Sequence, residues 1–128
     1  MREDQVHRYA RHILLPDVGG IGQRRLFQGA VVVDDLTGEA EAAVAYLAAA
    51  GVGTLVVRDR GVVEAPGFLF EASDVGRATL DALRERVAAL NPDVAVASQG
   101  DGLPLPPCPD LAAAAIAALS IVRTLAGH

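Results

Sequence analysis

Hydrophobic residues along the chain form short uninterrupted runs and longer segments with helical spacing. Residues 30–34, which end at Asp34, and residues 54–58, which Asp59 follows, are two mainly apolar runs rich in valine, and both predict buried strands. The alanine-rich residues 38–50 between them predict a helix, which Gly51 and Gly53 terminate. A strand, a helix and a strand within about 30 residues form a right-handed parallel crossover unit.

The second half of the chain continues this alternation. Residues 61–74 read as a loop, and residues 76–90 predict an amphipathic helix with one apolar face, made of Leu80, Leu83, Val87 and Leu90. The helix should stop at Asn91, because a residue before proline avoids the helical region. A third strand over 93–97, a proline-rich connector over 99–109 and a last helix over 110–126 complete the pattern.

Residues 1–29 predict an N-terminal helical segment. Val6, Tyr9 and Ile13 repeat at helical spacing, and a loop containing Pro16 follows. Residues 23–28 predict a short helix whose inward side chains are Leu26 and Phe27.

These elements predict one domain over residues 1–128 of the α/β class. Its core over 30–98 should be a Rossmann-like βαβαβ unit within a truncated three-layer sandwich, which has three or four mostly parallel strands and helices on both faces. An open sheet edge and a last helix apolar around most of its circumference would need a second chain to cover them.

Composition narrows the class of protein. The net charge of −5 argues against a nucleic-acid binder, and a single cysteine excludes an intrachain disulfide and a cysteine-rich zinc site. No apolar run reaches the roughly 20 residues needed to cross a bilayer, and the charged N-terminus does not resemble a secretory signal. We therefore expect a cytoplasmic protein without membrane or nucleic-acid partners.

The turn after the first strand is acidic where a nucleotide-binding turn is glycine-rich. Asp35 and Thr37 occupy the first two glycine places of a G-x-G-x-x-G pattern, and Ala40 occupies the third. A carboxylate about 5 Å from a phosphate charge costs about 3 kcal/mol at an effective dielectric of about 20. We interpret the turn as a helix cap formed by its own side chains (Asp34, Asp35 and Thr37), in preference to a metal site.

Several motifs resemble the ThiF/MoeB/HesA family, the bacterial relatives of ubiquitin-activating enzymes. They are Arg8 to Pro16 (RYARHILLP), Gly22 to Leu26 (GQRRL), Tyr46 to Leu55 (YLAAAGVGTL), Val75-Gly76 and Leu90 to Pro92 (LNP). The resemblance spans about residues 5–98, and the final helix is similar to a late helix of the family. It implies an enzyme that uses Mg-ATP to adenylate the C-terminal glycine of a ubiquitin-like sulfur carrier.

The same resemblance indicates a nucleotide site that is only vestigial. Asp59 stands where the family has its ribose-binding acid, and Gly38 is the glycine retained in the turn. A second acid, an asparagine, an arginine and a lysine of the family are replaced here by Gly61, Gly67, Phe70 and Thr79. We therefore predict no catalytic residue, no metal site and no bound cofactor, Mg-ATP being the ancestral ligand.

Arg11, together with Arg8, is the retained feature that points to a partner. In the family this arginine reaches across a dimer to the partner's ATP phosphates; the alternative is an ordinary solvated charge. His7 and His12 have poor spacing for a metal site, and Cys108 has no cation nearby in sequence to lower its pKa.

The leading hypothesis is a non-catalytic family member that acts as a dimer or partner-binding subunit in sulfur-carrier or cofactor biosynthesis. Its partner would be a second copy, a full-length family member or a ubiquitin-like sulfur carrier. The alternatives are a reduced ATP-dependent adenylyltransferase and an oligomeric scaffold unrelated to sulfur transfer.

Overall fold

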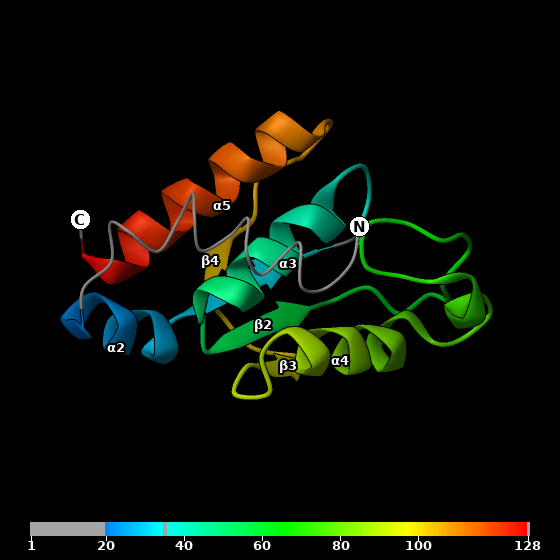
Figure 1. The fold of residues 1–128 in the computed structure, drawn as a ribbon, viewed down its shortest axis with the longest axis horizontal. Coiled ribbons are helices and arrows are strands. Elements are labelled where there is room, and N and C mark those ends of the chain that lie inside the picture. Colours follow the sequence, from blue (N-terminus) through cyan, green and yellow to red (C-terminus); the bar gives the residue numbers. More distant parts are fainter. Residues whose placement is uncertain (1–19, 35, 128) are drawn as a thin grey trace.

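The structure is a computed structural model that describes residues 20–34 and 36–127. The expectations for residues 1–19, including Arg8 and Arg11, and for Asp35 lie outside the described residues. Four parallel strands form one sheet in the order β3-β2-β1-β4 (Figure 1). Their bounds are β1 Ala30–Val33, β2 Thr54–Val57, β3 Ala95–Ala97 and β4 Leu103–Pro104. The α/β class and the parallel Rossmann-like sheet are confirmed.

The helices follow the predicted order, and their ends lie within a few residues of those expected. They are α2 Gly20–Gln28, α3 Ala40–Ala50, the short 3-10 helix η2 Ala72–Asp74, α4 Thr79–Leu90 and α5 Leu111–Ala126. Gly51 ends α3 in the left-handed conformation, with φ of 102°, and its N–H donates to the carbonyls of Leu47 and Ala48. Asn91 ends α4 in an extended conformation before Pro92, as predicted.

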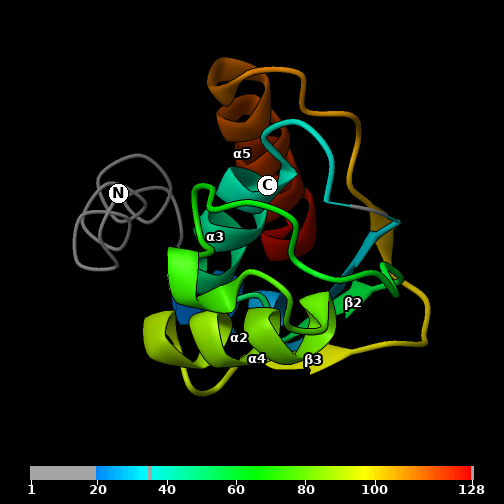
Figure 2. The same cartoon turned by 90° about the vertical axis from the view of Figure 1, so that its right-hand side faces the viewer.

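The described helices form one layer, although we expected helices on both faces of the sheet (Figures 1 and 2). Both crossovers run in the same direction along the sheet, so their right-handedness places α3 and α4 on one face. Helix α5 then packs on α3 and α2. The return from β3 to β4 contains no helix. Its Gly100 lies against Val56, on the face opposite the helices.

The core lies between this helical layer and the sheet. Val31 and Val33 of β1 and Leu55 and Val57 of β2 are buried against α3. Almost every residue of α3 is buried, because the helix lies between the sheet and two other helices. Because the alanine side chains of α3 are small, the sheet and the neighbouring helices can approach this helix closely.

Two details differ from the sequence interpretation. Leu26 is fully buried, but Phe27 is 59% exposed, because adjacent residues on a helix point about 100° apart and only one of the pair can face the core. The connector also contains β4, which pairs with β1 through Val31 and Leu103. A two-residue strand that itself contains a proline carries too little alternation to be recognised in sequence.

Helix α5 begins with a capping hydrogen bond, in which the Ala113 N–H donates to the Asp110 carboxylate over 2.8 Å. One face of α5 is buried, while Leu111 and Ile116 are exposed, so neighbouring elements cover this apolar helix on one side only. Within the described residues, no helix has the length and apolar character needed to cross a membrane.

Candidate functional site

The candidate site lies at the carboxyl ends of the strands, in the crevice between β1 and β4. Ligands of open parallel sheets bind at this position, where the direction of strand order reverses. A pocket of about 300 Å³ occupies it. Its lining residues are Val33, Asp34, Thr37, Ala40, Leu105, Pro106, Pro107 and Cys108. The fold therefore retains the place where a nucleotide of a Rossmann-like protein would bind.

A backbone carbonyl of the connector closes the start of α3. The Glu39 N–H donates to the Cys108 carbonyl oxygen over 2.7 Å. Gly38 has φ of +59°, and a Cβ atom there would lie 2.5 Å from the same oxygen. Helix N-termini bind phosphate through such free N–H groups, and here the chain supplies its own acceptor.

The side-chain cap expected from Asp34 is wrong, while Asp35 of the same expected cap lies outside the described residues. The N-cap residue of α3 is Glu39, whose side chain makes no capping hydrogen bond. The Asp34 carboxylate instead lies 3.4 Å from Arg58 of the β2 end, and Arg58 also donates to the Gly100 carbonyl over 3.0 Å. An arginine thus offsets part of the acidic charge that the sequence left unpaired, although both side chains are largely exposed.

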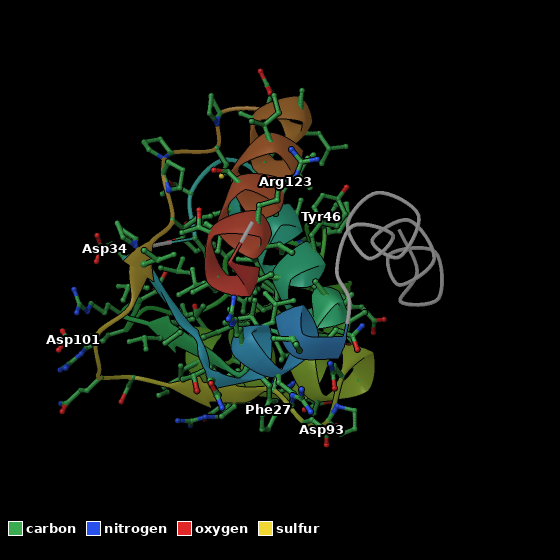
Figure 3. The ribbon with its side chains drawn as sticks, turned by 90° about the vertical axis from the view of Figure 1, so that its left-hand side faces the viewer. Phe27, Asp34, Tyr46, Asp93, Asp101 and Arg123 are labelled. Carbon is green, nitrogen blue, oxygen red and sulfur yellow. The ribbon has the colours of Figure 1, made fainter. Side chains whose placement is uncertain are left out.

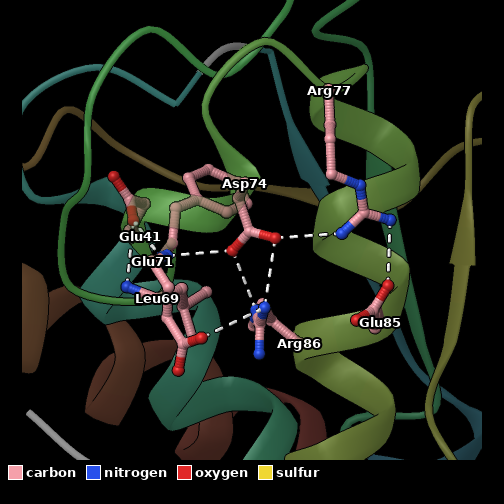
Figure 4. A network of polar contacts seen from close by, with 8 residues as sticks. Glu41, Leu69, Glu71, Asp74, Arg77, Glu85 and Arg86 are labelled. Carbon is pink, nitrogen blue, oxygen red and sulfur yellow. Dashed lines mark hydrogen bonds and ion pairs between the residues drawn. The ribbon is translucent and has the colours of Figure 1, made fainter.

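Glu41, in the first turn of α3, binds the loop that follows β2. Its carboxylate accepts the N–H groups of Leu69 over 2.9 Å and Phe70 over 3.3 Å (Figure 4). A Cβ atom on Gly67 would lie 2.5 Å from the same carboxylate. The carboxylate therefore fixes the loop in which the family resemblance places phosphate-binding side chains.

The structure places the remaining predicted site residues as follows. Asp59 follows β2 as expected, and its carboxylate accepts the Gly61 N–H over 2.8 Å in a local turn. Thr37 lines the pocket. Phe70 and Thr79 are buried and uncharged, so neither replaces the cationic side chain that the resemblance places at its position.

Sequence reasoning missed a buried ionic network beside this loop (Figure 4). Asp74 is fully buried and accepts hydrogen bonds from Arg86 at 2.9 and 3.1 Å, from Arg77 at 2.9 Å and from the Glu71 N–H at 2.9 Å. The hydrogen bonds from Arg86 contribute most, and the one from the Glu71 N–H next, to lowering the pKa of Asp74 to about 2, although desolvation by burial raises it. Glu85 pairs with the outer side of Arg77 at 2.9 Å. The sequence signal that could have predicted this network is the position of Asp74, three residues before Arg77 and twelve before Arg86.

Cys108 is a structural residue in this arrangement. Its side chain is buried, it donates to the Pro106 carbonyl over 3.3 Å, and burial raises the pKa of its thiol. A raised pKa disfavours the thiolate that nucleophilic chemistry requires. Across residues 20–34 and 36–127, no group of three or more potential ligands could hold a metal ion.

Comparison with known proteins assigns the class. Residues 9–123 match the ThiF family, and the chain belongs to that family. It is 36% identical over 100 residues to a probable adenylyltransferase/sulfurtransferase, MoeZ, of Mycobacterium tuberculosis. This match covers 75% of this chain and 26% of that protein. It is also 37% identical over 98 residues to the sulfur carrier protein ThiS adenylyltransferase of Escherichia coli. That match covers 73% of this chain and 39% of the relative.

A comparison with solved structures finds the same fold. The crystal structure of E. coli MccB with ATP superposes with a TM-score of 0.56 at 22% identity, over 60% of this chain and 24% of that one. This likeness concerns the fold alone. The chain spans about a quarter to two fifths of the length of these relatives.

Proposed function

We propose that this chain is a ThiF-family protein that does not itself adenylate a carrier. It acts instead as a partner-binding subunit in sulfur-carrier or cofactor biosynthesis. The observation that carries the proposal is the 2.7 Å hydrogen bond from the Glu39 N–H to the Cys108 carbonyl, because it fills the helix terminus on which a phosphate would depend.

The charges around the site support the same conclusion. Phosphoryl chemistry depends mainly on positioning and on cations that stabilise negative charge. Asp34 and Thr37 line the pocket, none of its lining residues is cationic, and Arg58 beside it already pairs with Asp34. An entering triphosphate would have to break that pair or approach an uncompensated carboxylate.

A reduced adenylyltransferase is the second candidate, and the pocket of about 300 Å³ beside β1 favours it. Asp59 also retains its place at the end of β2. For this candidate, the connector carrying Cys108 would have to move before a nucleotide could reach the start of α3.

Isothermal titration with Mg-ATP distinguishes the two candidates. We expect no heat of binding up to millimolar nucleotide. We also expect no ATP–pyrophosphate exchange when ThiS is added, with the ThiS adenylyltransferase of E. coli as the positive control. Micromolar binding together with exchange would establish the second candidate and overturn the first.

A variant separates the two reasons for which we expect the site to exclude ATP, namely the negative charge of the pocket and the occupied N-terminus of α3. Asp34→Asn removes one carboxylate from the pocket and leaves the Cys108 carbonyl in place. If charge alone excluded ATP, this variant would gain measurable binding. We expect it to remain without binding, because the helix terminus stays occupied.

A further inference from the structure

The connector before α5 contains a proline segment, residues 103–109. Every residue of this segment is a proline or immediately precedes one. Proline fixes φ at about −65°, and a residue before proline is confined to the extended or polyproline II region. After the two residues of β4, residues 105–108 form no helix, strand or turn. These restrictions favour a polyproline II conformation, which needs no internal hydrogen bonds.

Burial along the proline segment repeats every third residue. Cys108 is buried, and Leu105 is half-buried against the core. The residues beside them are exposed prolines, namely Pro104, Pro106, Pro107 and Pro109. Because polyproline II has three residues per turn, Leu105 and Cys108 form one edge of the segment, and this edge faces the core. The other two edges therefore present proline rings to solvent.

Hydrogen bonds hold the segment in place before any partner binds. The Leu105 N–H donates to the Val32 carbonyl of β1 over 2.9 Å. The Cys108 carbonyl accepts the Glu39 N–H over 2.7 Å, and Asp110, the residue after the segment, caps α5. A ligand that is fixed in this way loses little conformational entropy on binding, which strengthens its recognition.

The segment offers few N–H groups for pairing with a further strand, although we expected an open sheet edge. Within residues 103–109, only Leu103, Leu105 and Cys108 carry a backbone N–H. The Leu105 N–H already donates to β1, and Pro104 of the outer strand β4 has none. Strand addition at this edge is therefore disfavoured. Grooves lined with aromatic side chains, by contrast, recognise the rings of a polyproline II segment.

Acidic side chains surround the proline segment. Asp101 lies two residues before it and Asp110 directly after it, and both are exposed. Asp34 lines the pocket between β1 and β4 together with two of the prolines. Figure 3 shows Asp34 and Asp101 on the side of the molecule that the connector follows. Arg58 pairs with Asp34, whereas Asp101 forms no ion pair with any described residue. These charges complement a partner surface that carries cations.

We propose that the proline segment is the docking site for a partner domain whose groove is lined with aromatic side chains and bordered by arginine or lysine. The aromatic rings pack against the two exposed proline edges, and the bordering cations lie near Asp101 and Asp34. The inference rests on the partner-binding part of the proposed function and states the chemistry of the partner. Its test needs no nucleotide.

Titration of the full chain with three purified domains tests the proposal. SH3, WW and EVH1 domains all read polyproline II segments through aromatic-lined grooves. We expect at least one of them to bind with a dissociation constant of about 500 μM or less in a calorimetric titration. In the NMR spectrum of the ¹⁵N-labelled chain, the amide signals of Leu103, Leu105 and Cys108 should shift on addition of that domain.

Two sets of variants separate the proline rings from the charges. Pro104→Ala/Pro107→Ala removes two rings from one exposed edge and should weaken this binding about tenfold or more. Pro66→Ala is its matched control, because Pro66 is exposed in the loop after β2. Asp101→Lys should weaken the binding about threefold or more, as should added salt, and the exposed Glu64→Lys is its control. Circular dichroism and urea denaturation establish that each variant is folded.

A wild-type chain that binds none of the three domains at about 1 mM would overturn the proposal. So would binding that Pro66→Ala weakens as much as Pro104→Ala/Pro107→Ala does, or binding that Asp101→Lys leaves unchanged or strengthens. These outcomes are independent of the ATP titration, so a failure of this docking site and a failure of the proposed loss of adenylation are distinguishable.

Discussion

The Glu39 N–H donates to the Cys108 carbonyl oxygen across 2.7 Å, and this contact joins the start of α3 to the connector after β4. Residues 69 positions apart in sequence thus meet where a nucleotide-binding Rossmann-like fold receives phosphate. The connector performs a structural task that a ligand performs in nucleotide-binding members of this fold class. The contact also makes specific demands on neighbouring residues, which can be tested.

Gly38→Ala should destabilise the protein without any ligand present. The residue would have to adopt φ of +59° with a Cβ atom 2.5 Å from the Cys108 oxygen, and we expect the free energy of unfolding to fall by about 2 kcal/mol or more. Urea denaturation measures this change. Gly20→Ala is the control, since no atom lies within 4 Å of a Cβ there. Equal stability of the two variants would contradict the contact.

Glu41→Ala should loosen the loop after β2. It leaves the Leu69 and Phe70 N–H groups without their acceptor, and loss of a part-buried charged acceptor costs about 2 kcal/mol. Amide hydrogen exchange at residues 69 and 70 should accelerate, while exchange in β1 changes only with global stability. The exposed Glu64→Ala should have no such effect. Unchanged exchange at both amides would show that Glu41 does not hold the loop.

Asp74→Asn should be strongly destabilising. Removing one charge of a buried network leaves Arg86 and Arg77 without their shared carboxylate, which costs about 3 kcal/mol or more. Asp81→Asn is the control, because its 3.8 Å pair with Arg84 is exposed and should contribute less than about 1 kcal/mol. Chemical denaturation of both variants gives the comparison.

The same carboxylate predicts the acid dependence of stability. Its pKa is lowered from 3.8 to about 2 on folding, so its stabilisation is fully present above pH 4 and is lost as the pH falls through about 2. The loss amounts to about 2 kcal/mol in the wild type. In Asp74→Asn this part of the pH dependence should be missing. An identical acid profile in both proteins would refute the assignment.

Cys108 should react slowly with thiol reagents in the folded protein. It is buried, and burial raises the pKa of its thiol, so little thiolate exists at neutral pH. Modification by 5,5′-dithiobis(2-nitrobenzoate) at pH 7.5 should be complete only after denaturation. Rapid modification of the native chain would instead indicate an accessible, activated cysteine and would reopen a role in thioester chemistry.

Arg11→Ala tests the proposed contribution to a partner's site. If this arginine serves a full-length family member in trans, that enzyme's adenylation rate should increase when the wild-type chain is added, and Arg11→Ala should abolish the increase. Arg84→Ala, which changes an exposed arginine on α4, is the matched control. If both variants increase the adenylation rate equally, Arg11 is an ordinary solvated charge.

The strands and helices were largely predictable because their signals are local. The valine runs of β1 and β2, the alanine-rich α3 and the stop at Asn91 depend on periodicity and backbone preference alone. The direction of Phe27 was not predictable, because either of two adjacent apolar residues satisfies a short helical pattern. β4 was missed since its strand exists only through pairing with β1.

The features of the candidate site fall into the same two groups, those determined by local sequence and those determined by tertiary contacts. The sequence by itself determined the family resemblance, the acidic turn and the replacement of the expected cationic residues by Phe70 and Thr79. Only the tertiary structure decided what closes that turn, since the Cys108 carbonyl, Arg58 and Glu41 act on groups distant in sequence. It also decided that Asp74 is buried between two arginines. Backbone hydrogen bonds and desolvation depend on which segments meet in space, and a residue pattern does not specify those meetings.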